Sequence, residues 1–501
     1  MGLFHNMQPE RVTAWGAAIS DLKIDQLLGI STEAIARHIC YDFNEIQERQ
    51  KLLRDCINNE DLMITFKQIR DNIKSINQLF EKGTAYSETF EKIFYEVRSF
   101  QVYMDSINAL ELLYVSKKGL LQSERLIHFL ETFHTIYESK EYLEICLHVK
   151  ERLKNIDNIK SVTVGINLNM ALEPCDMGIV SINNYSFICP SYLQRKFSFA
   201  ENDRYLLASL IKFESDNNLL ERSLYLTINR ILAKSLKQYN SIILQWFRKS
   251  CSAIMSSFED IDFLCACVNF STLLKEKGGF MCFPECSESI QIEAIYNPRL
   301  LHKKAFRDIV SNDMCWNFEG IHMFVLTGAN SGGKSVFVES IGICQTLFQL
   351  GMIVPAQKAY MRPVGCVYVH FSTLMRLSEG ESRFASECSK MREILENSRK
   401  NDMILMDETF SATSENEGAA VAYYVLKRIK KISCMCLFST HIHGLIHYLP
   451  SINEDTKTVI PMHVECLNGI RTFRIVCGEH DESSHAYEIA QKYGLTFEDG
   501  D

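Results

Sequence analysis

The first part of the chain shows mainly helical spacing of its apolar residues. From about Thr32 to Asn158, apolar side chains recur three and four positions apart, prolines are few, and Glu, Lys and Arg fill the positions between them. One such series is Leu62, Phe66, Ile69, Ile73 and Ile76. This spacing places the apolar residues on one face of a helix, so the pattern predicts long amphipathic helices.

Near Ser161, apolar residues begin to occupy every second position, and further along the chain the three- and four-residue spacing of a helix returns. Val162, Val164, Ile166 and Leu168 alternate with other residues, and Asn183-Asn184 has the chemistry of a turn. These features predict a small strand-containing insert near 161–190. Helical spacing resumes from about 202 to 275, most clearly over 219–247, and we interpret that apolar stripe as ordinary helix packing.

Beyond a stretch rich in Gly, Cys and Ser at 278–289, the pattern becomes one of short strands that alternate with helices. Apolar runs at 324–326, 403–406 and 435–438 have the length and bounds of buried strands. Strands separated by helices are typical of an α/β domain with a mostly parallel sheet. We therefore expect a mainly helical module over 1–289 and an α/β domain over 290–501.

Composition limits the protein class further. A chain of 501 residues that is 47% hydrophobic exceeds one ordinary domain and is too apolar for disorder. It has no secretory start and no apolar run of membrane-spanning length, so we expect a cytoplasmic protein without a membrane partner. The net charge of −9 does not indicate an extended basic surface, although a local one is compatible with it.

The cysteines favour reduced, buried thiols over disulfides. All 18 are scattered, many of them through apolar segments. Cys282 with Cys286 and Cys434 with Cys436 are close groupings, and neither has a second Cys or His pair at zinc spacing. We therefore expect no zinc site.

The strongest chemical motif is a phosphate-binding loop. The pattern G-x-x-x-x-G-K-[ST] is matched by Gly328, Ala329, Asn330, Ser331, Gly332, Gly333, Lys334 and Ser335. An apolar strand leads into the loop and a helical run leaves it, an order that directs backbone N–H groups and a helix N-terminus at phosphate oxygens. Lys334 is predicted to contact the β and γ phosphates, and Ser335 to ligate Mg²⁺. ATP and Mg²⁺ are thus the predicted ligands.

Two further strand ends carry residues suited to nucleotide hydrolysis. Asp407 and Glu408 follow the apolar residues 403–406, and carboxyl ends of strands are where α/β sheets place ligands. Asp407 is predicted to hold Mg²⁺, and Glu408 to orient or deprotonate the attacking water. His441 ends the third strand and is predicted to sense the γ-phosphate, the alternative being a structural histidine.

Several segments together resemble the ATPase domain of the MutS family of DNA mismatch-repair proteins. In chain order these segments are 327–335, 351–356, 382–387, 407–408 and 438–441, and then 484–490 with 494–495, which resemble the last helix of that domain. Upstream, the segment 46–50 resembles the family's lever region. The resemblance implies an α/β P-loop NTPase domain, ABC-like and of MutS type, preceded by a helical lever and clamp module.

The resemblance also implies how the subunits assemble. ATPases of this family work as dimers in which each nucleotide lies between the P-loop of one subunit and a signature segment of the other. By position, Ser382 is the signature serine and would approach the γ-phosphate across the interface; the alternative is a helix N-cap. Asn312-Asp313 resembles the family's adenine-side segment. A homodimer and a mismatched or branched DNA duplex are the implied partners.

The sequence departs from the family pattern in several places. After Asp-Glu the family reads Ile-Gly-Arg-Gly-Thr-Ser, whereas Thr409-Phe410-Ser411-Ala412-Thr413-Ser414 lacks the arginine and both glycines. Met375 and Arg376 stand near positions that the family gives to acidic residues. Lever-like sequence begins by about Thr32 and the chain ends soon after Leu495, so we expect neither the mismatch-reading domain nor the C-terminal helix-turn-helix.

The preferred interpretation is ATP hydrolysis coupled to movement of a clamp on mismatched or branched duplex DNA. An alternative is an ABC-like ATPase clamp that acts on a non-DNA or ribonucleoprotein partner, which the negative charge favours. A degenerate ATPase kept as a binding module is a third hypothesis. The intact Lys334, Asp407 and Glu408 argue against the third.

Overall fold

A computed structural model describes residues 3–4, 9–84, 90–187, 251–316, 320, 322–328, 332–372, 382–467 and 470–478. Some sequence predictions lie outside the described residues: the stripe at 219–247, the loop residues Ala329, Asn330 and Ser331, the Met375-Arg376 pair, and the C-terminal matches at 484–490 and 494–495. Among the described residues, no helix is long and apolar enough to cross a membrane.

The chain divides into two compact units that differ from the predicted division at residue 289. The first comprises Ile64–Leu121 and Leu126–Phe258, and the second comprises Gly2–Met63, Gln122–Arg125 and Glu259–Asp501. The N-terminal helices therefore belong with the α/β part of the chain. Long-range contacts explain this assignment, for example the hydrogen bond that Cys40 N–H donates to the carbonyl of Gln349, 2.8 Å long.

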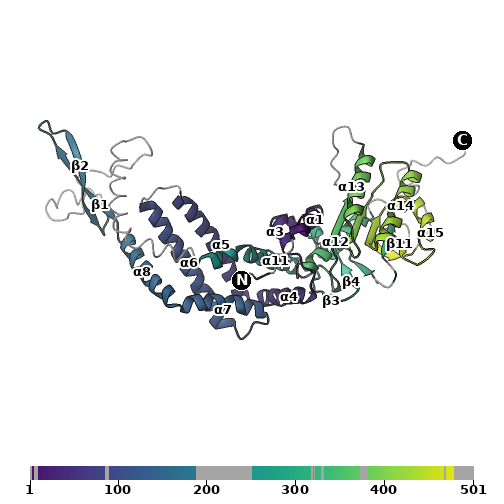
Figure 1. The fold of residues 1–501 in the computed structure, drawn as a ribbon, viewed down its shortest axis with the longest axis horizontal. Helices are drawn as coiled ribbons and strands as arrows, with labels where there is room; N and C mark the ends of the chain where they lie inside the picture. Colours follow the sequence, from purple (N-terminus) through teal and green to yellow (C-terminus); the bar gives the residue numbers. More distant parts are fainter. Residues whose placement is uncertain are drawn as a thin grey trace. The chain divides into compact units, whose positions relative to one another are not determined.

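The first unit is a set of long helices followed by a hairpin (Figure 1). Its helices are α5 (Glu60–Thr84, which begins in the second unit), α6 (Phe90–Lys117), α7 (Glu124–Glu138) and α8 (Lys140–Asp157). The apolar series from Leu62 to Ile76 is fully buried on one face of α5, as its spacing predicts. β1 (Ser161–Leu168) and β2 (Pro174–Asn183) pair antiparallel, in the segment where alternation predicts strands.

The second unit is built on a six-stranded sheet. Its strand order is β12-β11-β6-β10-β9-β8, with bounds β6 (Met323–Thr327), β8 (Val367–Phe371), β9 (Met403–Asp407), β10 (Met435–Ser439), β11 (Val459–Leu467) and β12 (Ile470–Cys477). Neighbouring strands are parallel except for the β11–β12 pair. β6, β9 and β10 are buried throughout, and their carboxyl ends lie at one edge of the sheet. The segments that follow these three strands at that edge contain the residues predicted to bind and hydrolyse the nucleotide.

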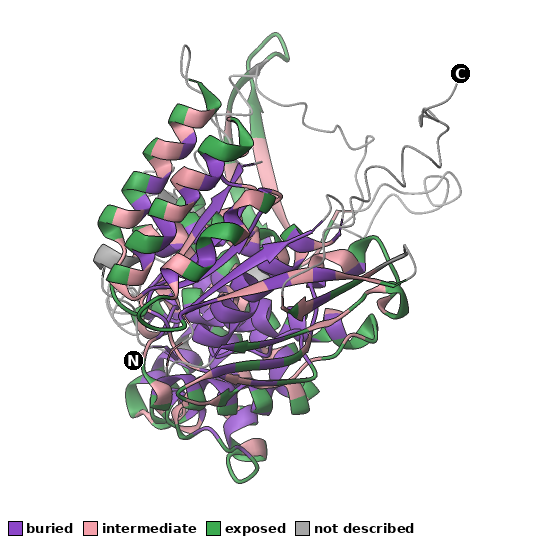
Figure 2. Cartoon of the chain, turned by 90° about the vertical axis from the view of Figure 1, so that its right-hand side faces the viewer, coloured by how far each residue is buried: buried purple, intermediate pink, exposed green. Residues whose placement is uncertain are grey.

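A smaller sheet and several helices complete the second unit. The smaller sheet has the order β3-β7-β4-β5, with bounds β3 (Glu285–Cys286), β4 (Ile290–Ile295), β5 (Asn312–Trp316) and β7 (Lys358–Met361). The helices are α1 (Pro9–Asp21), α2 (Ile24–Leu28), α3 (Thr32–Arg37), α4 (Phe43–Asn58), α11 (Phe258–Glu276), α12 (Lys334–Gln349), α13 (Arg383–Asn397), α14 (Glu415–Ile432) and α15 (Leu449–Ile452). The 3₁₀ turns are η1 (Pro298–His302), η2 (Phe306–Asp308) and η4 (His443–Tyr448). Figure 2 shows the central strands buried along most of their length, while helices carry exposed positions on their outer sides.

Three charged side chains of the second unit form a buried charge cluster: Glu45, Arg49 and Arg125. Arg49 donates from Nε to Glu45 Oε1 over 2.8 Å and from Nη1 to the carbonyl of His38. Arg125 donates to both carboxylate oxygens of Glu45, over 2.7 and 2.6 Å. Burial raises the pKa of Glu45, but the two guanidinium groups outweigh burial and lower the pKa to about 2. The cluster joins α4 to the start of α7.

Candidate active site

The predicted loop lies between β6 and α12, in the strand, loop and helix order that the sequence indicates. Gly328 has φ 131° and Gly333, which caps α12, has φ 86°. L-residues rarely adopt such angles, so both positions favour glycine. A Cβ atom at Gly328 would also lie 3.3 Å from the side chain of Val464 on β11. The backbone can thus turn tightly and present the N–H groups of the first helical turn at the sheet edge.

Lys334 is the first residue of α12 and its side chain turns back onto the loop. It is only 4% exposed, and its Nζ donates to the carbonyl of Gly328 over 2.6 Å. A buried ammonium is costly unless it is paired or hydrogen-bonded. The positive charge is therefore held next to the loop, where an anion would meet it together with the N-terminus of α12.

Asp407 ends β9 beside Ser439 of β10. Burial raises the pKa of Asp407; the hydroxyl groups of Ser335 and Ser439 and the charge of Lys334 oppose this shift, and Glu408 adds to it. The Ser335 and Ser439 hydroxyls are close enough to act on Asp407, but among the described residues neither Asp407 Oδ1 nor Ser439 Oγ makes a hydrogen bond of normal geometry, although both atoms are buried. A buried carboxylate oxygen without a partner costs about 1–3 kcal/mol or more. Its position beside Ser335 and Lys334 fits a hydrated divalent cation and a phosphate.

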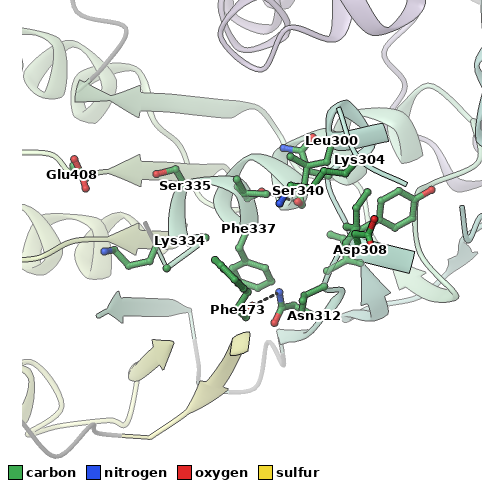
Figure 3. A pocket seen from close by; sticks show the side chains of 18 residues that line it. Leu300, Lys304, Asp308, Asn312, Lys334, Ser335, Phe337, Ser340, Glu408 and Phe473 are labelled. Atoms are coloured by element: carbon green, nitrogen blue, oxygen red, sulfur yellow. Dashed lines mark hydrogen bonds between the residues drawn. The ribbon is translucent and has the colours of Figure 1, made fainter. Parts of the chain in front are cut away.

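Glu408 is the next residue after Asp407 and, unlike it, is half-buried and lines a cavity. Its φ is 50°, and its N–H donates to the carbonyl of Ser439 over 2.9 Å. A left-handed conformation is uncommon for a non-glycine residue and turns the side chain away from the direction that the strand would give it. The cavity has a volume of about 330 Å³, and Lys334 and Ser335 line it together with Glu408 (Figure 3). The two neighbouring carboxylates therefore occupy different positions at the site.

The opposite part of the cavity is formed by residues that the sequence did not single out. Lys304 and Asp308 come from the segment between β4 and β5, and Phe473 comes from β12. Asn312 donates to the carbonyl of Phe473 over 3.2 Å and accepts from Ile475 N–H over 2.7 Å. Phe473 has φ 60°, and no sequence signal marks a phenylalanine for that conformation. Asn312 does lie in the segment predicted to be on the adenine side.

Four described residues of the predicted site do not line the cavity: Gly328, Asp407, Ser382 and His441. Ser382 is exposed and caps α13, where its Oγ accepts from Ala385 N–H over 3.2 Å. This is the N-cap alternative of the sequence analysis. His441 lies just beyond β10 and is partly buried, and its Nδ1 has no hydrogen-bond partner in the described part of the chain. Within one subunit, the structure thus gathers Gly332, Gly333, Lys334, Ser335 and Glu408 around the cavity. Asp407 and Gly328 lie behind this lining, in contact with Ser335 and Lys334, whereas Ser382 and His441 do not line it.

Chemically, the site combines an anion-binding end with two acidic groups. The helix N-terminus and Lys334 could attract phosphate, Ser335 and Asp407 could supply hard oxygen ligands, and Glu408 could serve as a partly accessible base. Among the described residues, no group of three or more His, Cys, Asp or Glu side chains is arranged to hold a metal ion.

Comparisons with known proteins show which sequences the chain is similar to. Residues 324–496 match the family model for MutS domain V. The chain is 25% identical over 362 residues to the DNA mismatch repair protein MutS of Caldicellulosiruptor saccharolyticus, 23% identical over 497 residues to that of Thermotoga petrophila, and 28% identical over 371 residues to that of Rickettsia bellii. These matches cover 71%, 91% and 70% of this chain, but only 40%, 58% and 38% of the respective relatives.

Proposed function

Because the chain belongs to the MutS family of DNA mismatch-repair proteins, we propose that its second unit is an ABC-like P-loop ATPase that hydrolyses ATP in the cavity beside α12. The observation that carries the proposal is the buried Asp407 carboxylate, whose Oδ1 is without a partner in the described structure while Ser335 and Lys334 lie beside it. Nucleotide with Mg²⁺ would satisfy all three groups.

Each residue of the site has a role in this proposal. The loop amides and Lys334 hold the phosphates, and Ser335 and Asp407 hold Mg²⁺. When bound, Mg²⁺ supplies positive charge against the phosphate oxygens. Glu408 orients the attacking water and accepts its proton, which its half-buried position at the cavity allows. His441 contacts the γ-phosphate end of the nucleotide.

The proposed active form is a homodimer. Ser382 is exposed at the N-terminus of α13, where its hydroxyl caps the first turn of the helix. A second copy would bring its nucleotide to this surface and complete the site. We expect light scattering to detect dimers with ATP and a smaller average mass without it. A monomer under both conditions would contradict a composite site.

The proposed partner of the clamp is mismatched or branched duplex DNA. The relatives' names support DNA mismatch repair, and the helical first unit supplies long elements that nucleotide binding can reposition, provided that ATP binds one arrangement better than another. A clamp on a non-DNA or ribonucleoprotein partner is the second candidate; the net charge of −9 is compatible with it, and none of the relatives' names supports it.

ATPase rates decide between the candidates. Rates are measured with homoduplex, mismatched, four-way-junction and single-stranded DNA and with RNA, and the Lys334→Ala variant reports contaminating activity. We expect stimulation by mismatched or branched duplexes, with a nucleic-acid affinity that falls steeply with salt because phosphate contacts release counterions. Turnover without stimulation by any DNA would reject the DNA assignment and leave the ATPase assignment standing.

A further inference from the structure

We infer that Glu387 of α13 is a positioning residue for Glu408, because it anchors the strained loop that follows the catalytic carboxylate. The inference rests on the proposed ATPase function. Glu387 does not line the cavity and would not touch nucleotide in the same subunit. Its effect on turnover would pass through the backbone of Thr409 and Phe410.

The loop after Asp407 is strained at two nearby positions. Glu408 has φ 50° and Phe410 has φ 66°, both in the left-handed region. Each such non-glycine residue costs about 1–2 kcal/mol, so it persists only where its surroundings hold it. The similar family has glycine where Phe410 stands, and glycine adopts this conformation freely. In this chain, a contact from elsewhere in the fold must therefore hold Phe410 in its left-handed conformation, whereas a glycine would adopt it without such a contact.

Glu387 supplies that constraint. Its Oε2 accepts from Phe410 N–H over 2.9 Å, and its side chain is 0% exposed. Burial raises the pKa of Glu387, whereas the Phe410 N–H and Arg383 oppose the shift. Arg383 Nε lies 3.4 Å from the other carboxylate oxygen. A buried carboxylate is costly unless it is hydrogen-bonded, and here one oxygen, Oε2, is hydrogen-bonded to the strained residue itself. The buried Oε1 makes no hydrogen bond within the described residues and has only the ion pair with Arg383.

His370 of β8 makes a second connection between the same elements. Its Nε2 lies 3.0 Å from the carbonyl of Glu387, and its Nδ1 lies 3.0 Å from Thr409 Oγ1. Burial lowers the pKa of His370 and favours the neutral ring. A neutral ring that donates from Nε2 to the carbonyl leaves Nδ1 as an acceptor, and the single hydroxyl proton of Thr409 is shared between Nδ1 and the carbonyl of His370, which lies 3.1 Å from Oγ1. Three consecutive residues of the loop are thus attached to three elements: Glu408 to β10, Thr409 to β8 and Phe410 to α13.

Aromatic rings from β8 and α13, the two elements that hold Thr409 and Phe410, also pack near the ring of Phe410. The rings of Phe384 and His370 each lie 6.3 Å from it, centre to centre. Loss of the Glu387 acceptor would leave the buried Phe410 N–H without its partner, and the loop could relieve strain by rotating toward an ordinary conformation. Glu408 would then shift relative to the cavity. A displacement of about 1 Å can cost roughly 10²-fold in rate.

The test compares two variants of Glu387 with a control on the same helix. Glu387→Ala removes the acceptor, Glu387→Gln keeps an amide oxygen that can accept from Phe410 N–H, and Glu396→Ala removes an exposed carboxylate from α13. Steady-state ATPase rates give kcat and KM, fluorescent nucleotide titration gives affinity, and melting curves show that each variant is folded.

We expect Glu387→Ala to lower kcat by about 10- to 100-fold with unchanged nucleotide affinity. Glu387→Gln should restore most of the parental kcat, and Glu396→Ala should match the parent. A folded Glu387→Ala variant with parental kcat, or a Gln variant as slow as the Ala variant, overturns the positioning role and leaves the ATPase proposal intact. Absence of turnover in the parent protein would instead overturn the ATPase proposal, and the inference with it.

Discussion

Two buried acidic groups of the second unit differ in how their charge is compensated. Glu45 of the charge cluster receives hydrogen bonds from two guanidinium groups at both of its oxygens, and its pKa falls to about 2. Asp407 at the sheet edge keeps a buried oxygen without a partner among the described residues, and its pKa is raised. The two carboxylates belong to the same unit, yet their surroundings shift them in opposite directions.

On the proposed function, the difference separates a structural carboxylate, Glu45, from one that a ligand would complete, Asp407. A buried ion pair with complete hydrogen bonding needs nothing further and holds its elements together. An incompletely satisfied buried carboxylate is tolerated where a ligand will complete it, and perturbed groups in cavities are therefore candidates for function. On this account, changes at Glu45 affect stability, whereas changes around Asp407 affect nucleotide binding and turnover.

The largest expected effect is on stability and concerns the charge cluster. Glu45→Ala leaves the fully buried Arg49 without its carboxylate, and breaking a buried pair in this way costs about 3–5 kcal/mol of unfolding free energy. Denaturant unfolding measures it. The control is Glu48→Ala on the same helix, which removes a partly exposed pair with Lys51 and should cost about 0–1 kcal/mol. Equal losses for the two variants would contradict the structural role of the cluster.

The next effect concerns binding and should leave the fold intact. Lys334→Ala removes the ammonium that faces the loop, and a charged hydrogen bond contributes about 1.5–3 kcal/mol, so ATP affinity should fall at least roughly 10- to 100-fold. Fluorescent-nucleotide titration with Mg²⁺ measures the loss. Lys303→Ala, an exposed neighbour of the cavity, is the matched control. Undiminished affinity in the Lys334 variant would mean that the loop is not the binding site.

The smallest effect is a pH dependence of opposite sign for the two carboxylates. The pKa of Glu45 is lowered from 4.5 to about 2, so its contribution to stability is present above pH 4.5 and is lost as the pH falls toward 2. The pKa of Asp407 is raised from 3.8, so its contribution weakens as the pH rises above that value. Without nucleotide, Asp407→Asn should therefore be slightly more stable than the parent at pH 7 and equal to it near pH 3.

Denaturant midpoints at the two pH values test this sign. The same Asp407→Asn variant should lose Mg²⁺-dependent ATP binding, which separates its role from that of Glu45. A variant that is less stable than the parent at pH 7 without nucleotide would show that Asp407 is a structural carboxylate.

Local patterns were enough to predict the elements and the motif of the site. The series from Leu62 to Ile76 is buried on one face of α5, and Lys334 and Ser335 open a helix directly after a glycine turn, as their sequences indicate. These features depend on spacing within a few residues and on the conformational freedom of glycine. The carboxylates after β9 were predicted for the same reason, because a buried run ending in Asp-Glu marks the end of a strand.

Features that depend on distant contacts could not be predicted. The N-terminal helices join the α/β unit through contacts such as Cys40 with Gln349, and nothing in either local sequence specifies the other. The left-handed conformations of Glu408 and Phe410 depend on Ser439 and Glu387, which lie on other elements. In the sequence, Glu387 is only one residue of the matching segment 382–387, because its burial and its hydrogen bond to Phe410 depend on the folded structure.

The most direct test of the account is the Glu408→Gln variant, assayed for ATP binding and for single-turnover hydrolysis on the same preparation. The substitution preserves size and hydrogen bonding but removes the group that accepts a proton from water, so hydrolysis should slow by about 10²- to 10⁴-fold. Binding should persist, because Lys334, Ser335 and Asp407 remain. Hydrolysis at the parental rate would contradict the account and reduce Glu408 to an ordinary carboxylate at the end of a strand.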